Sequence, residues 1–345
     1  MDDRIAVIGA GSWGTALAIS LALGGRDVSL WARRHDAAEI MRVERHNPTY
    51  LPNAVIPDTV LVTDNLEEAI KGRNVWLFAT PSQSVRDVAE RLSAHATPQH
   101  ILISVAKGIE NGTLLTTTGV LGDVVHAVPK GRLGVIYGPS HAEEVAAAVP
   151  TAVVVAANDL KVAEHVQRLF MSPRLRVYVN PDLRGVEIAG SVKNVLAIAT
   201  GICDGVDYGD NAKAALITRG LAEIKRLGTA MGGREGTFSG LAGIGDIVVT
   251  CMSKHSRNRY VGEQIGRGRA LEDIQAEMKM VAEGVRTAMS VHELAARQGV
   301  EMPISEAVYS ILFEGKSPRS AVHDLMTRDP KHEDRFYVDA TGDTE

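Results

Sequence analysis

The chain has 345 residues, 45% of them hydrophobic and 23% charged, which is typical of a folded protein large enough for two domains. Its net charge of −5, with no basic tract, argues against a nucleic-acid-binding surface. No uninterrupted apolar run of about 18 residues is present, which argues against a membrane span.

The first predicted element is a short apolar strand, Arg4–Ile8. It leads into Gly9-Ala10-Gly11-Ser12-Trp13-Gly14, and residues 15–21 then follow with helical apolar spacing. In such a turn the first glycine permits a sharp bend, the second lets the backbone approach a pyrophosphate, and the third lets the helix pack on the strand. The helix start also offers free N–H groups to phosphates. We therefore predict a dinucleotide site that includes Gly9, Gly11 and Gly14.

A second strand is predicted at residues 28–31, and it ends where an NAD-specific site usually places an acid for the ribose hydroxyls. Here that place is taken by Ala32-Arg33-Arg34. Arg33 and Arg34 could pair with a 2′-phosphate, and no carboxylate stands there to repel one. Asp36 follows two residues later, and its carboxylate could still repel a 2′-phosphate. The site is expected to accept NADP(H), with NAD(H) left open.

Strand-like runs continue to alternate with helical stretches as far as residue 183, at 75–79, 101–105, 133–136, 152–155 and 177–179. This alternation predicts a Rossmann-like α/β domain, with a mostly parallel sheet covered by helices on both faces. Open parallel sheets bind ligands beyond the carboxyl ends of their strands. Lys107 is the only charged residue among three loops expected there, at 80–82, 106–108 and 137–140, so we expect it to act in the site.

After residue 183 the β-rich runs almost vanish, and helical stretches follow at 186–200, 212–231, 285–298 and 304–313. We therefore predict a dinucleotide-binding domain over residues 1–183 and an all-α domain over 184–330, which would hold the substrate. The polar, acid-rich residues 331–345 are expected to form a flexible tail.

Lys193 is the first candidate for chemistry in the second half. It is a single cation in a nearly apolar helical stretch, after small residues that permit close approach. Partial burial would lower its pKa toward the working range of an acid or base. Since a nicotinamide enzyme needs a proton donor or acceptor at the carbonyl or alcohol, Lys193 is the predicted acid/base group.

A second constellation is the glycine-rich run that ends on Asp246, followed by Ser256-Arg257-Asn258. Asp246 could hold Lys193 or a substrate hydroxyl. Ser256 is expected to cap the helix that runs toward Ile265. The free N–H groups at this helix start, the Ser256 and Asn258 side chains and the Arg257 guanidinium together predict a phosphate site.

No metal site is predicted. Asp204, Asp207 and Asp210 recur every three residues rather than every two, as an EF-hand loop would require. His292-Glu293 lacks the second histidine of a zinc-binding helix.

These motifs in this order resemble bacterial NAD(P)-dependent sn-glycerol-3-phosphate dehydrogenases. The resemblance covers about residues 4–330 and rests on Gly9 to Ala16, Gly138-Pro139-Ser140, Lys193-Asn194, Gly240 to Asp246, Ser256-Arg257-Asn258 and Val281-Ala282-Glu283-Gly284. It implies reversible reduction of dihydroxyacetone phosphate to sn-glycerol 3-phosphate, which supplies glycerophospholipid synthesis.

The resemblance also implies site residues. It makes Lys193 the catalytic proton donor and acceptor. It places at the substrate Lys107, Gly138, Ser140, Lys193, Asp246, Ser256, Arg257 and Asn258. It places at the nucleotide, besides the three glycines, Ser12, Trp13, Arg33, Arg34, Lys107, Ala142, Arg257, Val281 and Glu283. The chain departs from the family at His141, where an aromatic residue such as Phe is usual, and at Ile247, where Leu is usual.

Two other functions stay open at this point. One is a reductase of a small carbonyl acid, such as a ketopantoate-type enzyme, although a phosphate site argues against it. The other is a dinucleotide-sensing regulator without catalysis, against which the complete set of substrate residues argues. The absence of a signal peptide pattern, and two cysteines without C-x-x-C spacing that are expected to be buried, favour a cytoplasmic location. Analogy of fold predicts a homodimer.

Overall fold

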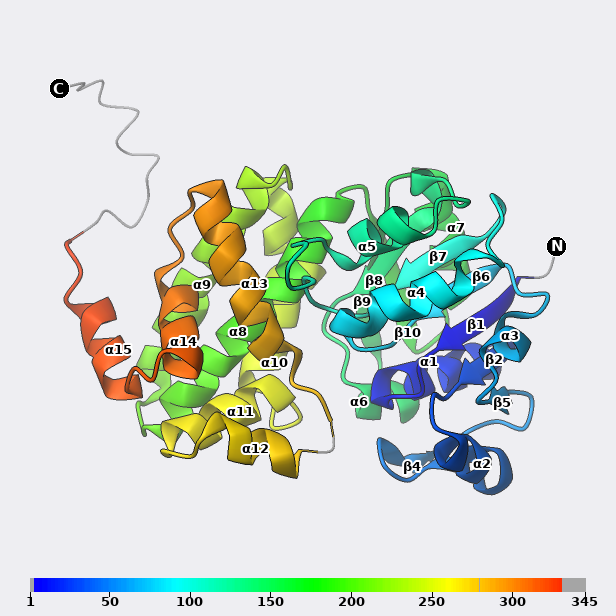
Figure 1. Cartoon of the computed structure of the whole chain (residues 1–345), viewed down its shortest axis with the longest axis horizontal. Helices are drawn as coiled ribbons and strands as arrows, with labels where there is room; N and C mark the ends of the chain where they lie inside the picture. The colour runs from blue at the N-terminus through cyan, green and yellow to red at the C-terminus, as the bar shows by residue number, and fades with distance from the viewer. Residues whose placement is uncertain (1–2, 279, 331–345) are drawn as a thin grey trace.

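The structure is a computed structural model that describes residues 3–278 and 280–330. The tail predicted at 331–345 lies outside the described residues. An eight-stranded, mostly parallel sheet forms the first half, and helices form the second half, as Figure 1 shows. The predicted fold class is confirmed.

All the predicted strands are present, and they lie in one sheet. In spatial order the strands are β10 (Leu175–Asn180), β9 (Thr151–Ala157), β8 (Leu133–Tyr137), β7 (Ile101–Ser104), β6 (Val75–Phe78), β1 (Arg4–Ile8), β2 (Asp27–Trp31) and β5 (Leu61–Thr63). β5 and a small hairpin of β3 (His46–Asn47) and β4 (Leu51–Val55) were not predicted. β3 and β5 have only two and three residues, too few to show a strand period, and β4 contains a proline and an asparagine, which are unfavourable in strands.

One pair in the sheet is antiparallel. β8 and β9 run in opposite directions, whereas every other pairing in this sheet is parallel. A parallel neighbour would need a crossover that packs back on the sheet. The segment between β8 and β9 holds only the five-residue helix α6 (Ala142–Ala146), which packs on α1 (Ser12–Leu23). The alternation of strands and helices therefore predicted the sheet but not this reversal.

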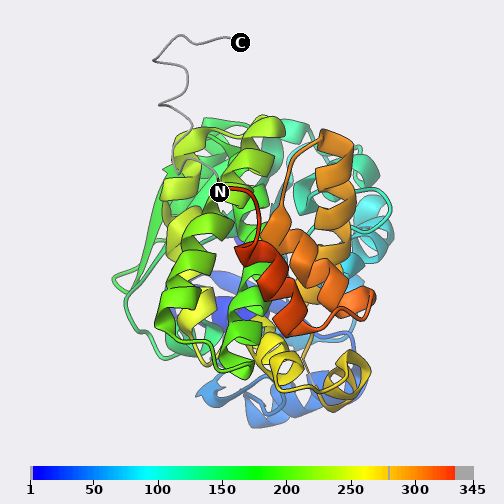
Figure 2. The same ribbon diagram turned by 90° about the vertical axis from the view of Figure 1, so that its left-hand side faces the viewer.

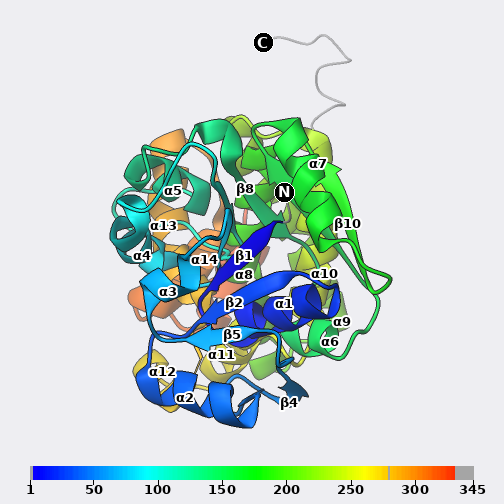
Figure 3. The same ribbon diagram turned by 90° about the vertical axis from the view of Figure 1, so that its right-hand side faces the viewer.

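Helices cover both faces of the sheet because its strands are apolar on both sides. Alternate residues of each strand enter different cores: Val7 and Leu77 pack under α1, α6, α2 (His35–Glu44) and α7 (Leu160–Phe170). Ile8 and Phe78 pack under α3 (Leu66–Ile70), α4 (Val85–Ser93) and α5 (Thr117–Val124), on the opposite side in Figure 3.

The second half is built around α8 (Leu183–Gly205). Around it lie α9 (Asp210–Ala230), α10 (Asp246–Met252), α11 (Arg257–Gly266), α12 (Leu271–Glu277), α13 (Glu283–Gln298), α14 (Pro303–Phe313) and α15 (Pro318–Met326). Figure 2 views this half end on, with the orange and red helices α13 to α15 beside green α9. Among the described helices, α8 is long and apolar enough to cross a membrane. Its most apolar stretch, however, is entirely buried in the protein.

Glycines let the backbones of α11 and α8 lie in direct contact where the two helices cross. A Cβ on Gly201 would lie 2.0 Å from the carbonyl oxygen of Arg259, and a Cβ on Gly262 would lie 2.0 Å from that of Ile198. Both distances are far below contact. This close approach brings the beginning of α11 next to the middle of α8, where Lys193 lies. Cys203 on α8 and Cys251 on α10 are buried and free, as predicted.

Candidate active site

The predicted cofactor motif lies at the point where the strand order reverses. From β1 the chain continues outward through β2 and β5, whereas β6, on the other side of β1, leads to β7 and β8. The glycine turn follows β1, and residues 79–81 follow β6 at the same edge. Ligands of open α/β sheets bind at such a reversal.

The three glycines of this turn meet three different surroundings. Gly9 has a φ of +121°, and a Cβ there would lie 2.8 Å from the carbonyl oxygen of Ala79. A Cβ on Gly14 would lie 1.9 Å from the carbonyl oxygen of Gly9, so α1 packs directly on the turn. A Cβ on Gly11 would meet nothing within 4 Å. The backbone at the start of α1 is therefore open to a ligand.

Two buried polar atoms beside this turn lack partners in the part of the chain that the structure describes. They are the Trp13 Nε1 atom at the start of α1 and the Thr80 Oγ1 atom just after β6. Buried polar groups are normally hydrogen-bonded. A dinucleotide lying along this edge carries many donors and acceptors, so these two side chains fit such a group.

Arg33 and Arg34 lie beyond the carboxyl end of β2, with both side chains exposed. The Arg34 Nε atom is 3.6 Å from Asp36 Oδ1, so the positive charge of Arg34 offsets the negative charge of Asp36. Arg33 and Arg34 thus present positive charge where a ribose would lie.

Asp246 is the centre of the predicted reaction site. It begins α10, only 1% of its surface is exposed, and its two oxygens bind two lysines. Lys193 Nζ is 2.8 Å from Oδ1, and Lys107 Nζ is 2.7 Å from Oδ2. Lys107 follows β7, whereas Lys193 lies in α8, so the carboxylate joins the two halves of the chain. The prediction that Asp246 could hold Lys193 is confirmed.

Burial lowers the pKa of Lys193 to about 8, and the positive charge of Lys107 acts in the same direction. Asp246 opposes both by favouring the charged ammonium. Lys193 also donates a hydrogen bond to Thr250 Oγ1, and this hydroxyl in turn donates to the backbone carbonyl of Asp246, at 2.6 Å. Lys193 can therefore change its protonation near neutral pH while its position stays fixed.

Thr250 was missed in the sequence analysis. It lies four residues after Asp246 on the same helix, so the two side chains share one face. That spacing was a usable signal once Asp246 had been selected.

The predicted phosphate site lies at the beginning of α11. Ser256 caps the helix as predicted, because its hydroxyl oxygen accepts from the backbone N–H of Arg259 at 3.2 Å. The Arg257 side chain is exposed, and its NH1 donates to the carbonyl oxygen of Val281 at 3.1 Å. The guanidinium thus stands at the mouth of the site, between α11 and the segment that precedes α13.

Asn258 makes two hydrogen bonds to other helices, and neither was predicted from the sequence. Its Nδ2 donates to Asn194 Oδ1 at 3.0 Å, and its Oδ1 accepts from the backbone N–H of Gly284 at 2.9 Å. The Nδ2 of Asn194 reaches the carbonyl oxygen of Lys107 at 3.3 Å. Asn258 and Asn194 therefore tie α8, α11 and α13 to the loop after β7. Asn194 directly follows Lys193 in the sequence, which was the available signal.

The remaining predicted residues lie after β8 and at the beginning of α13. The carbonyl oxygen of Gly138 accepts hydrogen bonds from Lys107 Nζ at 3.1 Å and from the Ser140 hydroxyl at 3.1 Å. Ala142 begins α6.

Both carboxylate oxygens of Glu283 are bound by Ser82, which donates its backbone N–H at 3.0 Å and its hydroxyl. Glu283 thus fixes the loop after β6. The side chain of Val281 is 49% exposed.

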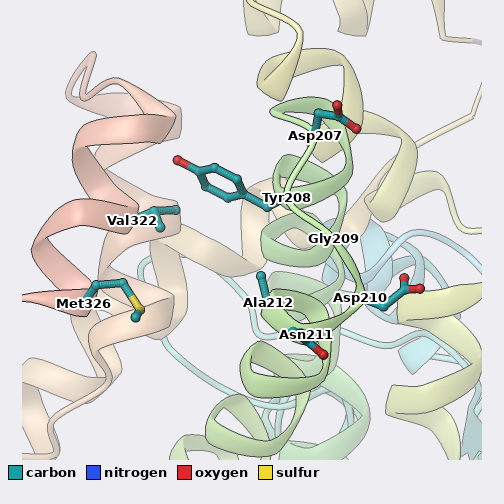
Figure 4. A pocket seen from close by; sticks show the side chains of 8 residues that line it. All are labelled: Asp207, Tyr208, Gly209, Asp210, Asn211, Ala212, Val322 and Met326. Carbon is teal, nitrogen blue, oxygen red and sulfur yellow. The ribbon is translucent and has the colours of Figure 1, made fainter.

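A separate hollow of about 580 Å³ lies between the turn joining α8 to α9 and helix α15, as Figure 4 shows. Its lining includes Tyr208, Asp210, Val322 and Met326, and none of the predicted site residues. Asp204, before this turn, is bound to Lys213 at 2.9 Å and to Arg259 at 2.6 Å. No group of three or more metal-ligating side chains occurs within residues 3–278 and 280–330.

Both halves of the chain match models of one protein family. Residues 4–163 match the family model of the NAD-dependent glycerol-3-phosphate dehydrogenase N-terminus, and residues 182–323 match that of the C-terminus.

Similar full-length proteins are known. A glycerol-3-phosphate dehydrogenase [NAD(P)+] 1 of Salinibacter ruber is 60% identical over 331 residues, 96% of this chain and 97% of that protein. A glycerol-3-phosphate dehydrogenase [NAD(P)+] of Chlorobium phaeobacteroides is 52% identical over 330 residues, 96% and 99% of the two chains. The crystal structure of a Coxiella burnetii glycerol-3-phosphate dehydrogenase superposes with a TM-score of 0.90 at 41% identity, covering 94% of this chain and 99% of that one.

Proposed function

The chain belongs to the NAD-dependent glycerol-3-phosphate dehydrogenase family, and on that basis we propose that Lys193 is its proton donor and that the start of α11 binds its substrate phosphate. The enzyme is an NAD(P)-dependent oxidoreductase that reversibly reduces dihydroxyacetone phosphate to sn-glycerol 3-phosphate, which supplies glycerophospholipid synthesis. The observation that carries the assignment of roles is the buried Lys193–Asp246–Lys107 cluster at the carboxyl edge of the sheet.

The nicotinamide, when bound, supplies a hydride to the carbonyl carbon of the substrate. Lys193, in its ammonium form, gives a proton to the carbonyl oxygen, which completes the secondary alcohol. In the reverse direction, neutral Lys193 accepts the hydroxyl proton. Its pKa of about 8 supports both roles, because both forms are populated near neutral pH. Asp246 and Thr250 hold the Nζ atom in place during this exchange.

The substrate phosphate is assigned to Ser256, Arg257 and the free N–H groups at the beginning of α11. A helix start favours anions, and a guanidinium adds charge-assisted hydrogen bonds. Lys107, Gly138, Ser140 and Asp246 are assigned to the rest of the substrate. Asn258 is assigned there as well, and its observed contacts also support a role in holding Asn194 and α13 in place.

The dinucleotide is assigned to the edge formed by the glycine turn. Gly9, Gly11, Gly14, Ser12, Trp13 and Ala142 would surround the pyrophosphate and nicotinamide, with Lys107, Arg257 and Val281 beside them. Arg33 and Arg34 would meet the ribose 2′-position. Glu283 is assigned to the same region, where its hold on Ser82 would position the loop after β6.

Steady-state oxidation of NADPH and of NADH in the presence of dihydroxyacetone phosphate tests this function. We expect turnover that saturates with the phosphorylated substrate, and little or none with ketopantoate under the same conditions. Tight NADPH binding without turnover of any carbonyl would instead support a regulator. Turnover of ketopantoate alone would move the assignment to the other reductase class.

Residues 1–183 are proposed to form the dinucleotide-binding domain and residues 184–330 the substrate domain. We also propose a homodimer. Two apolar side chains one turn apart on α10, Val248 and Met252, are 45% and 53% exposed, and a second copy would cover them. Light scattering after gel filtration would give twice the monomer mass of 36.9 kDa if this is right. A cytoplasmic location is proposed from the free cysteines, and cell fractionation tests it.

A further inference from the structure

His141 is a half-buried side chain near the proposed active site, and the proposed mechanism gives it no role. It follows Ser140 and directly precedes α6. Its Nε2 atom is buried and has no hydrogen-bond partner within the described part of the chain. Leaving such an atom without a partner is unfavourable, because the group loses its hydrogen bond to water and gains none in return. A ligand that supplies the partner would recover this cost.

The surroundings of His141 connect its loop to the proposed phosphate site and to the glycine run before Asp246. Its ring centroid is 5.6 Å from that of His255, with the planes tilted by 55°. His255 directly precedes Ser256, so the ring pair adjoins the beginning of α11. On the other side, the loop that carries His141 lies against the glycine run before Asp246. A Cβ on Gly245 would be in ordinary contact with Pro139, at 3.8 Å.

Charges from each neighbouring element act on this imidazole. Burial is the main effect that lowers the pKa of His141, and Lys193 on α8 and His255 before α11 act in the same direction. Glu143 and Glu144 on α6 act in the opposite direction. The net effect is to keep the ring neutral at physiological pH. A neutral imidazole still carries one N–H, so it can donate a hydrogen bond without adding a charge.

We propose that His141 is a substrate-binding residue, whose Nε2–H donates a hydrogen bond to a phosphate oxygen of the bound substrate, with His255 covering its ring. The inference rests on the proposed function, because it requires a phosphorylated substrate at Ser256 and Arg257. We choose a phosphate oxygen rather than the substrate carbonyl oxygen as the acceptor, because the His255 ring next to His141 adjoins the proposed phosphate site. The carbonyl oxygen already has its proton donor in Lys193.

Two substitutions separate hydrogen bonding from packing. H141F keeps a ring of similar size but removes the donor, whereas H141Q loses the ring but carries an amide N–H close to the position of Nε2. We expect H141F to raise the KM for dihydroxyacetone phosphate about 10-fold or more, with kcat within about twofold, as for loss of a hydrogen bond to a charged group. We expect H141Q to retain a KM within about threefold of wild type.

The opposite order, with H141F close to wild type and H141Q impaired, would mean that the ring only fills space, and would overturn the proposal. A fall in kcat at unchanged KM would overturn it as well, because the contact would then be to the reacting carbonyl. The control is H323F, on the exposed side chain of His323 in α15, which is expected to leave every constant unchanged.

A binding measurement tests the same contact without turnover. Calorimetric titration of the NADPH-bound enzyme with sn-glycerol 3-phosphate gives a complex that cannot react. H141F should weaken this binding by the same factor as the KM change, while the Kd for NADPH stays within about twofold. A comparable change in the Kd for NADPH would assign His141 to the cofactor and overturn the proposal. If wild type does not turn over dihydroxyacetone phosphate, the proposed function fails. If it does and H141F is unchanged, only this inference fails.

Discussion

Lys107 and Lys193 come from different halves of the chain, yet they bind opposite oxygens of one buried carboxylate, that of Asp246. The arrangement holds two ammonium groups close together with a single negative charge between them. Burial is the main effect that lowers the pKa of Lys193, and the positive charge of Lys107 lowers it further. The same three side chains therefore link the two halves of the chain and surround the proposed acid/base group.

The first prediction concerns pH. Below its pKa of about 8, Lys193 carries the proton that reduction consumes, so kcat for reduction should fall as the pH rises through about 8. Oxidation needs neutral Lys193, so its kcat should rise over the same range. Asp246 raises the pKa of Lys193, so D246N should move both midpoints to lower pH. Midpoints that stay in place in D246N would show that another group controls the profile.

Removal of the acid/base group is the second prediction. K193M should lower kcat about 10²- to 10⁴-fold, the usual contribution of a positioned proton donor. The Kd for NADPH, measured by fluorescence titration, should change little. The matched control is K161M, on an exposed lysine of α7, which should behave as wild type. Near-normal kcat in K193M would remove Lys193 from this role.

A third prediction addresses phosphate binding. R257A should raise the KM for dihydroxyacetone phosphate roughly 10- to 100-fold, because hydrogen bonds to a charged partner contribute about 1.5–3 kcal/mol. It should also weaken cofactor binding, since Arg257 holds the segment at Val281. R297A, on an exposed arginine of α13, serves as the control. An unchanged KM would place the phosphate elsewhere.

Cofactor choice gives the fourth prediction. The double variant R33A/R34A should raise the Kd for NADPH about 5- to 30-fold, because charge-assisted bonds to the 2′-phosphate are lost. NADH lacks this phosphate and acts as the internal control, so its Kd should stay nearly constant. Equal weakening of both cofactors would show that the two arginines do not read the 2′-position.

The fifth prediction concerns stability. G262A places a methyl group 2.0 Å from the Ile198 carbonyl oxygen, which forces α11 away from α8. Overpacking of this kind costs about 1–3 kcal/mol, and Tm should fall by several degrees in calorimetry. A Cβ on Gly236 would meet nothing within 4 Å, so G236A should leave Tm unchanged or slightly higher. Equal Tm values for the two variants would contradict the close helix crossing.

Much of this site could be predicted because the relevant signals are local in sequence. The strand before Gly9 and the helix after Gly14 define the cofactor turn, Lys193 is the one cation in its helical stretch, and Ser256 has the side chain of a helix cap. Each of these depends on backbone conformation or apolar period over a few residues. Local preference and tertiary structure agree at these positions.

The partners of these residues could not be predicted in the same way. Glu283 binds Ser82 and Asn258 binds Asn194 across sequence separations that carry no periodic signal. That the Nε2 of His141 has no partner among the described residues could not be predicted either. The antiparallel pairing of β8 with β9 was missed for a related reason, because it depends on where the short helix α6 packs.

The sequence by itself predicted most strands and helices in their order, the glycine turn, and Lys193 as the proposed acid/base residue. Backbone geometry and hydrophobic period act over short distances, so these features are encoded locally. Only the tertiary structure decided which charges meet at Asp246, since that depends on the packing of the helical half against the sheet edge. Burial at that contact lowers the pKa of Lys193, which supports its proposed role as the acid/base group.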